Sequence, residues 1–150
     1  MRIVIQRVSR ASVTIDGTLH SSIGRGLMIL VGVENGDTED DVRWLAAKTA
    51  SLRIFPDEQG IMNRSVTDCA GDVLAVSQFT LTASTRKGNR PSYIRAAGHD
   101  IAVPLYEMYC HTVGELISRE VKKGVFGADM AVELINDGPV TIIIDSKIRE

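Results

Sequence analysis

The 150-residue chain has little of what several protein classes require. Its two cysteines, Cys69 and Cys110, are too few for a secreted disulfide scaffold and are not spaced as metal ligands, which favours a reducing compartment. Its longest uncharged apolar runs, such as 27–33, fall far short of the roughly 20 residues that cross a bilayer. Residues 1–7 lack the pattern of a signal peptide. We therefore expect a cytoplasmic protein with no membrane partner.

Neither sign of charge dominates, and aromatic residues are scarce. The 17 Lys and Arg against 19 Asp and Glu give a formal net charge of -2, so the chain lacks the broad positive field of sequence-independent nucleic-acid binders. With 5% aromatic residues it also has few side chains on which single-stranded bases stack. Any nucleic-acid partner must therefore be held by local contacts.

The apolar pattern predicts one α+β domain over residues 1–150, because 44% of the residues are hydrophobic and no linker or repeat divides the chain. Two long helices are expected, one from a capping box at Thr38 and Asp41 to about residue 51, the other over about 100–122. Strands are expected over 2–8, 11–16 and 18–23, which together suggest a β-meander. Further strands are expected over 27–33, 73–81, 130–135 and 140–145.

The common catalytic motifs are absent. There is no phosphate-binding glycine loop, dinucleotide fingerprint or nucleophile elbow. The three histidines, His20, His99 and His111, lie far apart in the sequence without metal-ligand spacing, and we interpret them as surface or locally bonded side chains. We therefore expect neither a metal nor a cofactor.

One expected core strand, 73–81, carries the polar residues Ser77, Gln78 and Thr80. Strand alternation places Ser77 and Phe79 on one face and Gln78 and Thr80 on the other, unless a bulge or the strand end turns them together toward a cleft. The plain alternative is a half-exposed strand with an ordinary polar face.

Two further sequence features bear on function, a basic segment and a Gly-Pro pair. Residues 85–95 hold four positive charges and no acidic residue. Such a loop is usually only solvated, but one directly after a polar strand could position the phosphates of a substrate held at that strand's end. Gly138-Pro139 separates two apolar β-segments and is most simply an ordinary turn with a trans bond.

Together these features resemble the D-aminoacyl-tRNA deacylases of the D-tyrosyl-tRNA deacylase type. Each motif is weak alone, but their joint order and spacing are specific. The resemblance spans nearly the whole chain and rests on Ile5-Gln6-Arg7-Val8, Arg10-Ala11-Ser12-Val13, Ser77-Gln78-Phe79-Thr80-Leu81, Arg90-Pro91-Ser92, Phe126-Gly127-Ala128-Asp129-Met130 and Asn136-Asp137-Gly138-Pro139-Val140-Thr141.

The resemblance implies a barrel-like β-core with two helices, a homodimer, and hydrolysis of the ester that joins a D-amino acid or glycine to the 3′-terminal adenosine of tRNA. It implies that Gly138-Pro139 is cis and enters the partner subunit's pocket, where it excludes L-amino acids. Arg7 would orient this motif, and Phe126 and Met130 would lie near the terminal adenosine.

The resemblance also assigns the chemistry to Ser77, Gln78, Phe79 and Thr80. Ser77, Gln78 and the Phe79 backbone N–H would position the carbonyl and stabilise its oxyanion, while a ribose hydroxyl assists. Thr80 is either a nucleophile or a group that orients water. Two other functions stay open: a non-catalytic tRNA-end binding module that uses residues 84–95, and a small-molecule esterase with Thr80 or Ser77 as nucleophile.

Overall fold

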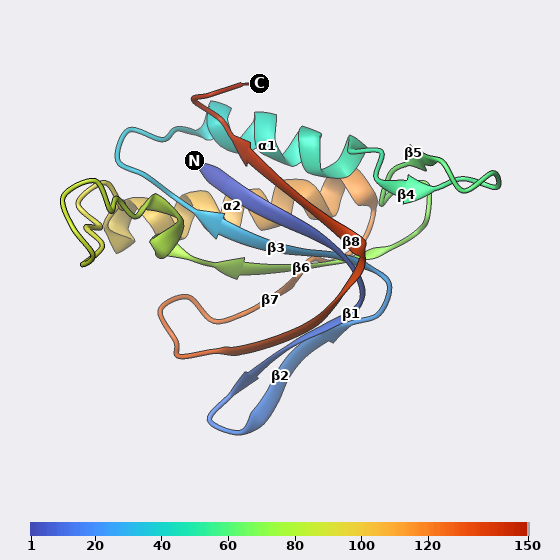
Figure 1. The fold of residues 1–150 in the computed structure, drawn as a ribbon, viewed down its shortest axis with the longest axis horizontal. Coiled ribbons are helices and arrows are strands. Elements are labelled where there is room, and N and C mark those ends of the chain that lie inside the picture. Colours follow the sequence, from blue (N-terminus) through green and yellow to red (C-terminus); the bar gives the residue numbers. More distant parts are fainter. Residues whose placement is uncertain (150) are drawn as a thin grey trace.

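One long strand, β1 (Arg2–Ile15), organises the sheet in the computed structural model, which describes residues 1–149. β8 (Ala131–Asp145) pairs antiparallel with nearly all of β1 along one edge. Along the other edge, β3 (Gly26–Gly32) pairs with the first half of β1 and β2 (Thr18–Ile23) with the second half. Parallel strands β6 (Asp72–Ser77) and β7 (Lys122–Lys123) extend the sheet beyond β3 (Figure 1).

The sheet curls into a nearly closed barrel. At the seam, the Ser21 hydroxyl of β2 donates a hydrogen bond to the backbone oxygen of Lys123 in β7, at 2.8 Å. This closure covers an edge that would otherwise be open. The expected single α+β domain with a barrel-like core and two main helices is confirmed.

Two helices, α1 (Glu39–Ser51) and α2 (His99–Ile117), lie side by side against one face of the sheet (Figure 1). The main core fills the space between this face and the helices. A second, smaller core lies on the opposite face, inside the curled part of the sheet, and includes Val8, Val13, Met28 and Leu74. No described helix has the length and apolar character needed to span a membrane.

The start of α1 agrees with its expected capping box. The Asp41 carboxylate accepts hydrogen bonds from the Thr38 backbone N–H, at 2.8 Å, and from the Thr38 hydroxyl, at 3.1 Å. Burial by itself would raise the pKa of Asp41, but hydrogen bonds from Lys147, Ser146 and Thr38 hold this pKa well below its ordinary value. The carboxylate therefore stays ionised and keeps the helix start in place.

Several expected element bounds and pairings are wrong. α2 ends at Ile117 rather than near residue 122, because Ser118 adopts a left-handed conformation and turns the chain back toward β7. The expected segments 2–8 and 11–16 form one continuous strand, β1, so the expected β-meander reduces to a hairpin of β1 and β2. The last two expected strands form one strand, β8, in which Gly138-Pro139 is an irregularity and not a turn.

The short elements complete the chain. The hairpin of β4 (Phe55–Pro56) and β5 (Met62–Arg64) surrounds a turn at 57–60. The expected strand 73–81 stops at Ser77, and a 3-10 helix, η1 (Phe79–Thr82), follows it. The chain turns here because the Gln78 backbone N–H donates to Val31 of β3, at 2.8 Å, and the Leu81 N–H then donates to the Gln78 oxygen, at 3.2 Å.

The close approach of β3 and β6 requires glycine at position 26. A methyl group there would lie 1.8 Å from the backbone oxygen of Asp72, the residue paired with Gly26. We therefore expect Gly26→Ala to lower the free energy of unfolding by about 2 kcal/mol or more, measured by urea denaturation. Gly24→Ala is the matched control, since no atom lies within 4 Å of the added methyl group. Equal stability of the two variants would contradict this packing.

Candidate functional site

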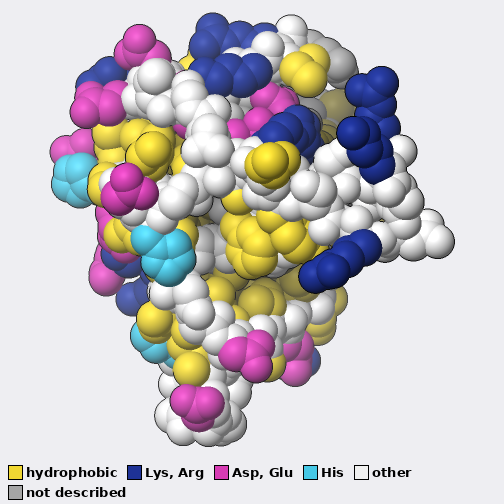
Figure 2. All heavy atoms as spheres, turned by 90° about the vertical axis from the view of Figure 1, so that its left-hand side faces the viewer, with side chains coloured by type: hydrophobic (Ala, Val, Ile, Leu, Met, Phe, Trp, Pro, Cys, Tyr) yellow, Lys and Arg dark blue, Asp and Glu magenta, His cyan; other side chains and the backbone are white. Residues whose placement is uncertain are grey.

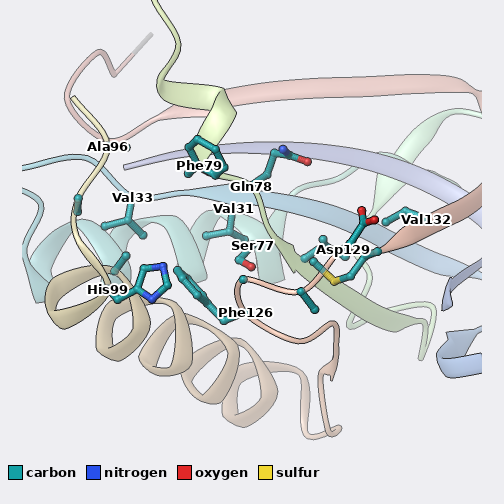
Figure 3. Close-up of a pocket in the computed structure, with 16 residues that line it drawn as sticks. Val31, Val33, Ser77, Gln78, Phe79, Ala96, His99, Phe126, Asp129 and Val132 are labelled. Carbon is teal, nitrogen blue, oxygen red and sulfur yellow. The ribbon is translucent and has the colours of Figure 1, made fainter. Parts of the chain in front are cut away.

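A cavity of about 540 Å³ opens where β6 ends. Its walls come from the β6–η1 junction, from residues 96–102 around the start of α2, and from the loop that leads into β8. Figure 3 shows Ser77 near the middle of the cavity, with Phe79 on one side and both His99 and Phe126 on the other. A volume of this size suits a ligand of several hundred daltons.

The turn after Ser77 places Ser77, Gln78 and Phe79 together on the cavity wall. The expected alternation of these residues between two faces therefore fails, and the strand end turns them toward one cleft. Ser77 and Gln78 are half-buried, whereas 55% of Phe79 is exposed. Such a group of polar atoms at a strand end can bind a polar ligand without interrupting the core.

Thr80 lies just outside the cavity wall. Its hydroxyl oxygen accepts a hydrogen bond from the side-chain amide of Gln78. In η1, the Thr82 hydroxyl donates to the Phe79 backbone oxygen, at 2.9 Å. The structure thus connects Thr80 to the cavity through Gln78, and it places three of the four expected catalytic residues on the cavity wall itself.

The opposite wall is aromatic. Phe126 packs edge-on against His99, with ring centroids 5.2 Å apart, and against Tyr106, at 5.9 Å. The Tyr106 hydroxyl donates to the backbone oxygen of Ala75, at 2.9 Å, and burial holds the pKa of this phenol well above its ordinary value. The neutral Tyr106 therefore fixes Phe126 against β6. Met130 lines the same cavity.

Two cavity residues, His99 and Asp129, were not expected from the sequence. His99 is the first residue of α2 and follows a segment without periodicity, so we expected a surface histidine. It is exposed, but its ring faces the cavity beside Phe126 (Figure 3). Asp129 belongs to one of the resemblance motifs, yet nothing in its spacing points to a cavity.

Gly138 and Pro139 do not line this cavity. The strand register places Ser77 level with Val31, which pairs with Ile3, which pairs with Ile144. Ile144 lies five residues beyond Pro139, or about 17 Å along an extended strand. One chain therefore keeps Gly138-Pro139 apart from the β6–η1 junction. The peptide bond between Gly138 and Pro139 is cis, as the resemblance implies.

Arg7 lies beside the Gly138-Pro139 segment. It is 8% exposed, and its guanidinium donates to the backbone oxygens of Asp137, at 3.1 Å, and Ile54, at 2.6 Å. The Asp137 carboxylate lies 3.3 Å away. A methyl group at Gly138, where φ is 128°, would lie 2.8 Å from the Arg7 guanidinium. The side chain of Arg7 therefore fixes the backbone that precedes Pro139.

The nearly closed barrel with a cavity at the end of β6 defines a single-domain α+β protein with a site for a small ligand or the end of a larger one. The chain belongs to the D-Tyr-tRNA(Tyr) deacylase family, whose model matches residues 4–145.

Named relatives agree with this assignment, and a solved structure shares the fold. Proteins named D-aminoacyl-tRNA deacylase from Parabacteroides distasonis and Flavobacterium johnsoniae are 59% and 54% identical over 150 residues, covering all of both chains. The structure of a c-Myc DNA unwinding element binding protein superposes with a TM-score of 0.90 at 39% identity, covering 97% of this chain and 98% of the other.

The hydrogen bonds of Arg7 predict that its replacement lowers the free energy of unfolding. Arg7→Met leaves two backbone oxygens without their charged donor, so we expect the free energy of unfolding to fall by about 2–4 kcal/mol. Arg10→Met is the matched control, because Arg10 pairs with Glu133 in an ion pair whose side chains are 65% and 73% exposed. Loss of this exposed ion pair should lower the free energy of unfolding by less than about 1 kcal/mol. Similar urea midpoints for both variants would refute the role of Arg7.

Proposed function

We propose that this protein hydrolyses the ester of D-aminoacyl-tRNA and of glycyl-tRNA, releases the free amino acid and tRNA, and spares L-aminoacyl-tRNA. The observation that supports this function is the cavity where Ser77, Gln78 and Phe79 face Phe126 and Met130 in a chain of this family. Because charged tRNA is used in the cytoplasm, we place the protein there.

The two cavity walls suit different parts of the substrate. Phe126 and Met130 offer apolar surface to the terminal adenosine. Ser77 and Gln78 offer a hydroxyl and an amide to the ester carbonyl. The Phe79 backbone N–H opens η1, where the first N–H groups have no acceptor within the helix, so it is free to stabilise the oxyanion.

Thr80 acts in this proposal as a positioning residue. Gln78 already donates its amide to the Thr80 hydroxyl, so Thr80 orients the amide that faces the ester. The substrate's 2′-hydroxyl assists the attack of water on the carbonyl carbon. The ester bond to the 3′-oxygen then breaks, and that oxygen leaves with a proton. The protein side chains position and polarise these groups.

Selection against L-amino acids needs a second copy of the chain in this proposal. The Gly138-Pro139 segment is separated from the cavity of its own chain, so it reaches a cavity only in a partner subunit. There its backbone carbonyls accept hydrogen bonds from the substrate α-ammonium, and its bulk excludes the side chain of an L-amino acid. The side chain of a D-amino acid is not recognised. Glycine, which is achiral, is accepted.

The outer edge of β8 supports a dimer. Within the described residues, β8 pairs only with β1, so one edge of this 15-residue strand lacks a β partner. Large apolar side chains are exposed along it, with Ile135 at 47% and Ile143 at 66%. A long unpaired strand edge is usually covered by another segment or chain, and a second copy of this protein can cover it in a dimer.

Enantiomer discrimination tests the proposed function. We expect the purified protein to deacylate D-tyrosyl-tRNA and glycyl-tRNA and to leave L-tyrosyl-tRNA intact, measured by release of labelled amino acid. Equal rates for both tyrosyl enantiomers would refute the proposed selectivity. Binding of charged tRNA without turnover would favour a binding module, whereas turnover of a simple D-tyrosine ester at the same rate would favour an esterase.

The positioning role of Thr80 predicts how its replacement changes kcat. If Thr80 only positions Gln78, Thr80→Ala should lower kcat by about 10²–10³, as for the loss of one oxyanion-hole donor. Thr80→Ser, which retains the hydroxyl, should recover most of the rate. A substrate with a 2′-deoxy terminal adenosine should react very slowly with the unaltered protein. Normal turnover of that substrate, or a kinetically competent aminoacyl-Thr80 adduct, would contradict this mechanism.

A further inference from the structure

The basic loop, defined here as residues 84–92, begins and ends beside the cavity. Ser84 and Ser92 close its base with two backbone hydrogen bonds, each 2.9 Å long. Phe79 precedes the loop, Ala96 follows it, and both line the cavity. The loop extends from the end of the molecule at which η1 and the start of α2 meet (Figure 1). It therefore lies at the cavity mouth.

The segment that follows the loop is tied to the cavity wall. The Arg95 guanidinium donates to the Thr82 backbone oxygen, at 3.1 Å, and the Asn35 N–H donates to the Arg95 oxygen, at 2.9 Å. Tyr93 packs edge-on against Phe79, with ring centroids 5.0 Å apart. With its base fixed, the loop tip lies within about 14 Å of the Ser84–Ser92 pair, the length of four extended residues.

The tip carries three cations that have no partner within residues 1–149. Arg86, Lys87 and Arg90 are exposed, and none of them takes part in a described ion pair or side-chain hydrogen bond. No acidic residue lies in the loop. Figure 2 shows Lys and Arg side chains above and beside the hydrophobic hollow on this face, with acidic side chains mainly to its left and below.

We propose that the basic loop is a phosphate-binding surface for the acceptor end of the RNA substrate, with Arg86, Lys87 and Arg90 on backbone phosphates. This inference rests on the proposed function. If the terminal nucleoside of the tRNA binds in the cavity, the rest of the RNA acceptor strand leaves through the cavity mouth and passes the basic loop. Contacts to phosphates position a nucleic acid without reading its sequence. A chain with a net charge of -2 needs this charge concentrated at one place.

The loop should act on binding and not on the chemical step. In the triple variant R86Q/K87Q/R90Q we expect KM for D-tyrosyl-tRNA to rise about tenfold or more with kcat nearly unchanged. The slope of log KM against log salt concentration should fall by about 2, since each lost phosphate contact removes roughly 0.7–0.9. R43Q/K48Q/K122Q is the matched control, with the same change in charge at exposed positions away from the loop, and it should behave like the unaltered protein.

Two further measurements separate this inference from the proposed function. The substrate 3′-O-(D-tyrosyl)adenosine has no phosphate, so the loop variant and the unaltered protein should hydrolyse it equally. Binding of uncharged tRNA, measured by fluorescence anisotropy, should weaken about tenfold in the loop variant whether or not any substrate is hydrolysed. Unchanged tRNA affinity and KM, or an equal loss of rate on the phosphate-free substrate, would overturn the proposal. If the unaltered protein hydrolyses neither D-tyrosyl-tRNA nor the phosphate-free substrate, the proposed function is overturned instead.

Discussion

The pairing of β8 with β1 around Arg7 is the constraint on which the rest of the fold depends. Gln6 pairs with Thr141, and Val8 pairs with Asn136, so β8 uses three more residues than β1 to pass Arg7. The Arg7 guanidinium holds the extra residues through the Asp137 oxygen. Both ends of β8 therefore stay paired while Gly138-Pro139 departs from the regular ladder.

A second register shift, between Val8 and Arg10, lets β1 serve both cores. Ile3 and Ile5 face the helices, and plain alternation puts Val8 on the opposite face, inside the curled sheet. Because β1 uses one more residue than β8 between Val8 and Arg10, Val13 stays on the same face as Val8. The curl then brings β7 against β2 and leaves the cavity at the end of β6, while Gly138-Pro139 lies elsewhere.

Sequence patterns predicted the parts of the fold that local physics controls. The capping box of α1 is as expected, since it depends on two residues that lie three apart. The Gly138-Pro139 irregularity and the end of α2 were not predicted. A turn and a bulge use the same residues, and only pairing with a distant strand decides between them.

The site shows the same division. Ser77 and Gln78 drew attention because polar residues in a core strand need partners, and the structure places both on the cavity wall. Their common orientation depends on a hydrogen bond to Val31, which no local pattern contains. His99 was missed because its role arises from the packing of the start of α2 on Phe126. Long-range contacts of this kind leave no period in the sequence.

A mixing experiment decides whether two chains share each site. Thr80→Ala, which should keep about 1% of the rate or less, and Gly138→Ala should each be nearly inactive, and their folding is checked by circular dichroism. After denaturation and joint refolding in equal amounts, half of the dimers are mixed and each mixed dimer has one intact site, so about a quarter of the unaltered activity should return. The reciprocal arm mixes a Thr80→Ala/Gly138→Ala double variant with unaltered protein, and should leave about a quarter of the activity instead of half. No recovery in the first mixture and half of the activity in the second would show that each chain has a complete site of its own.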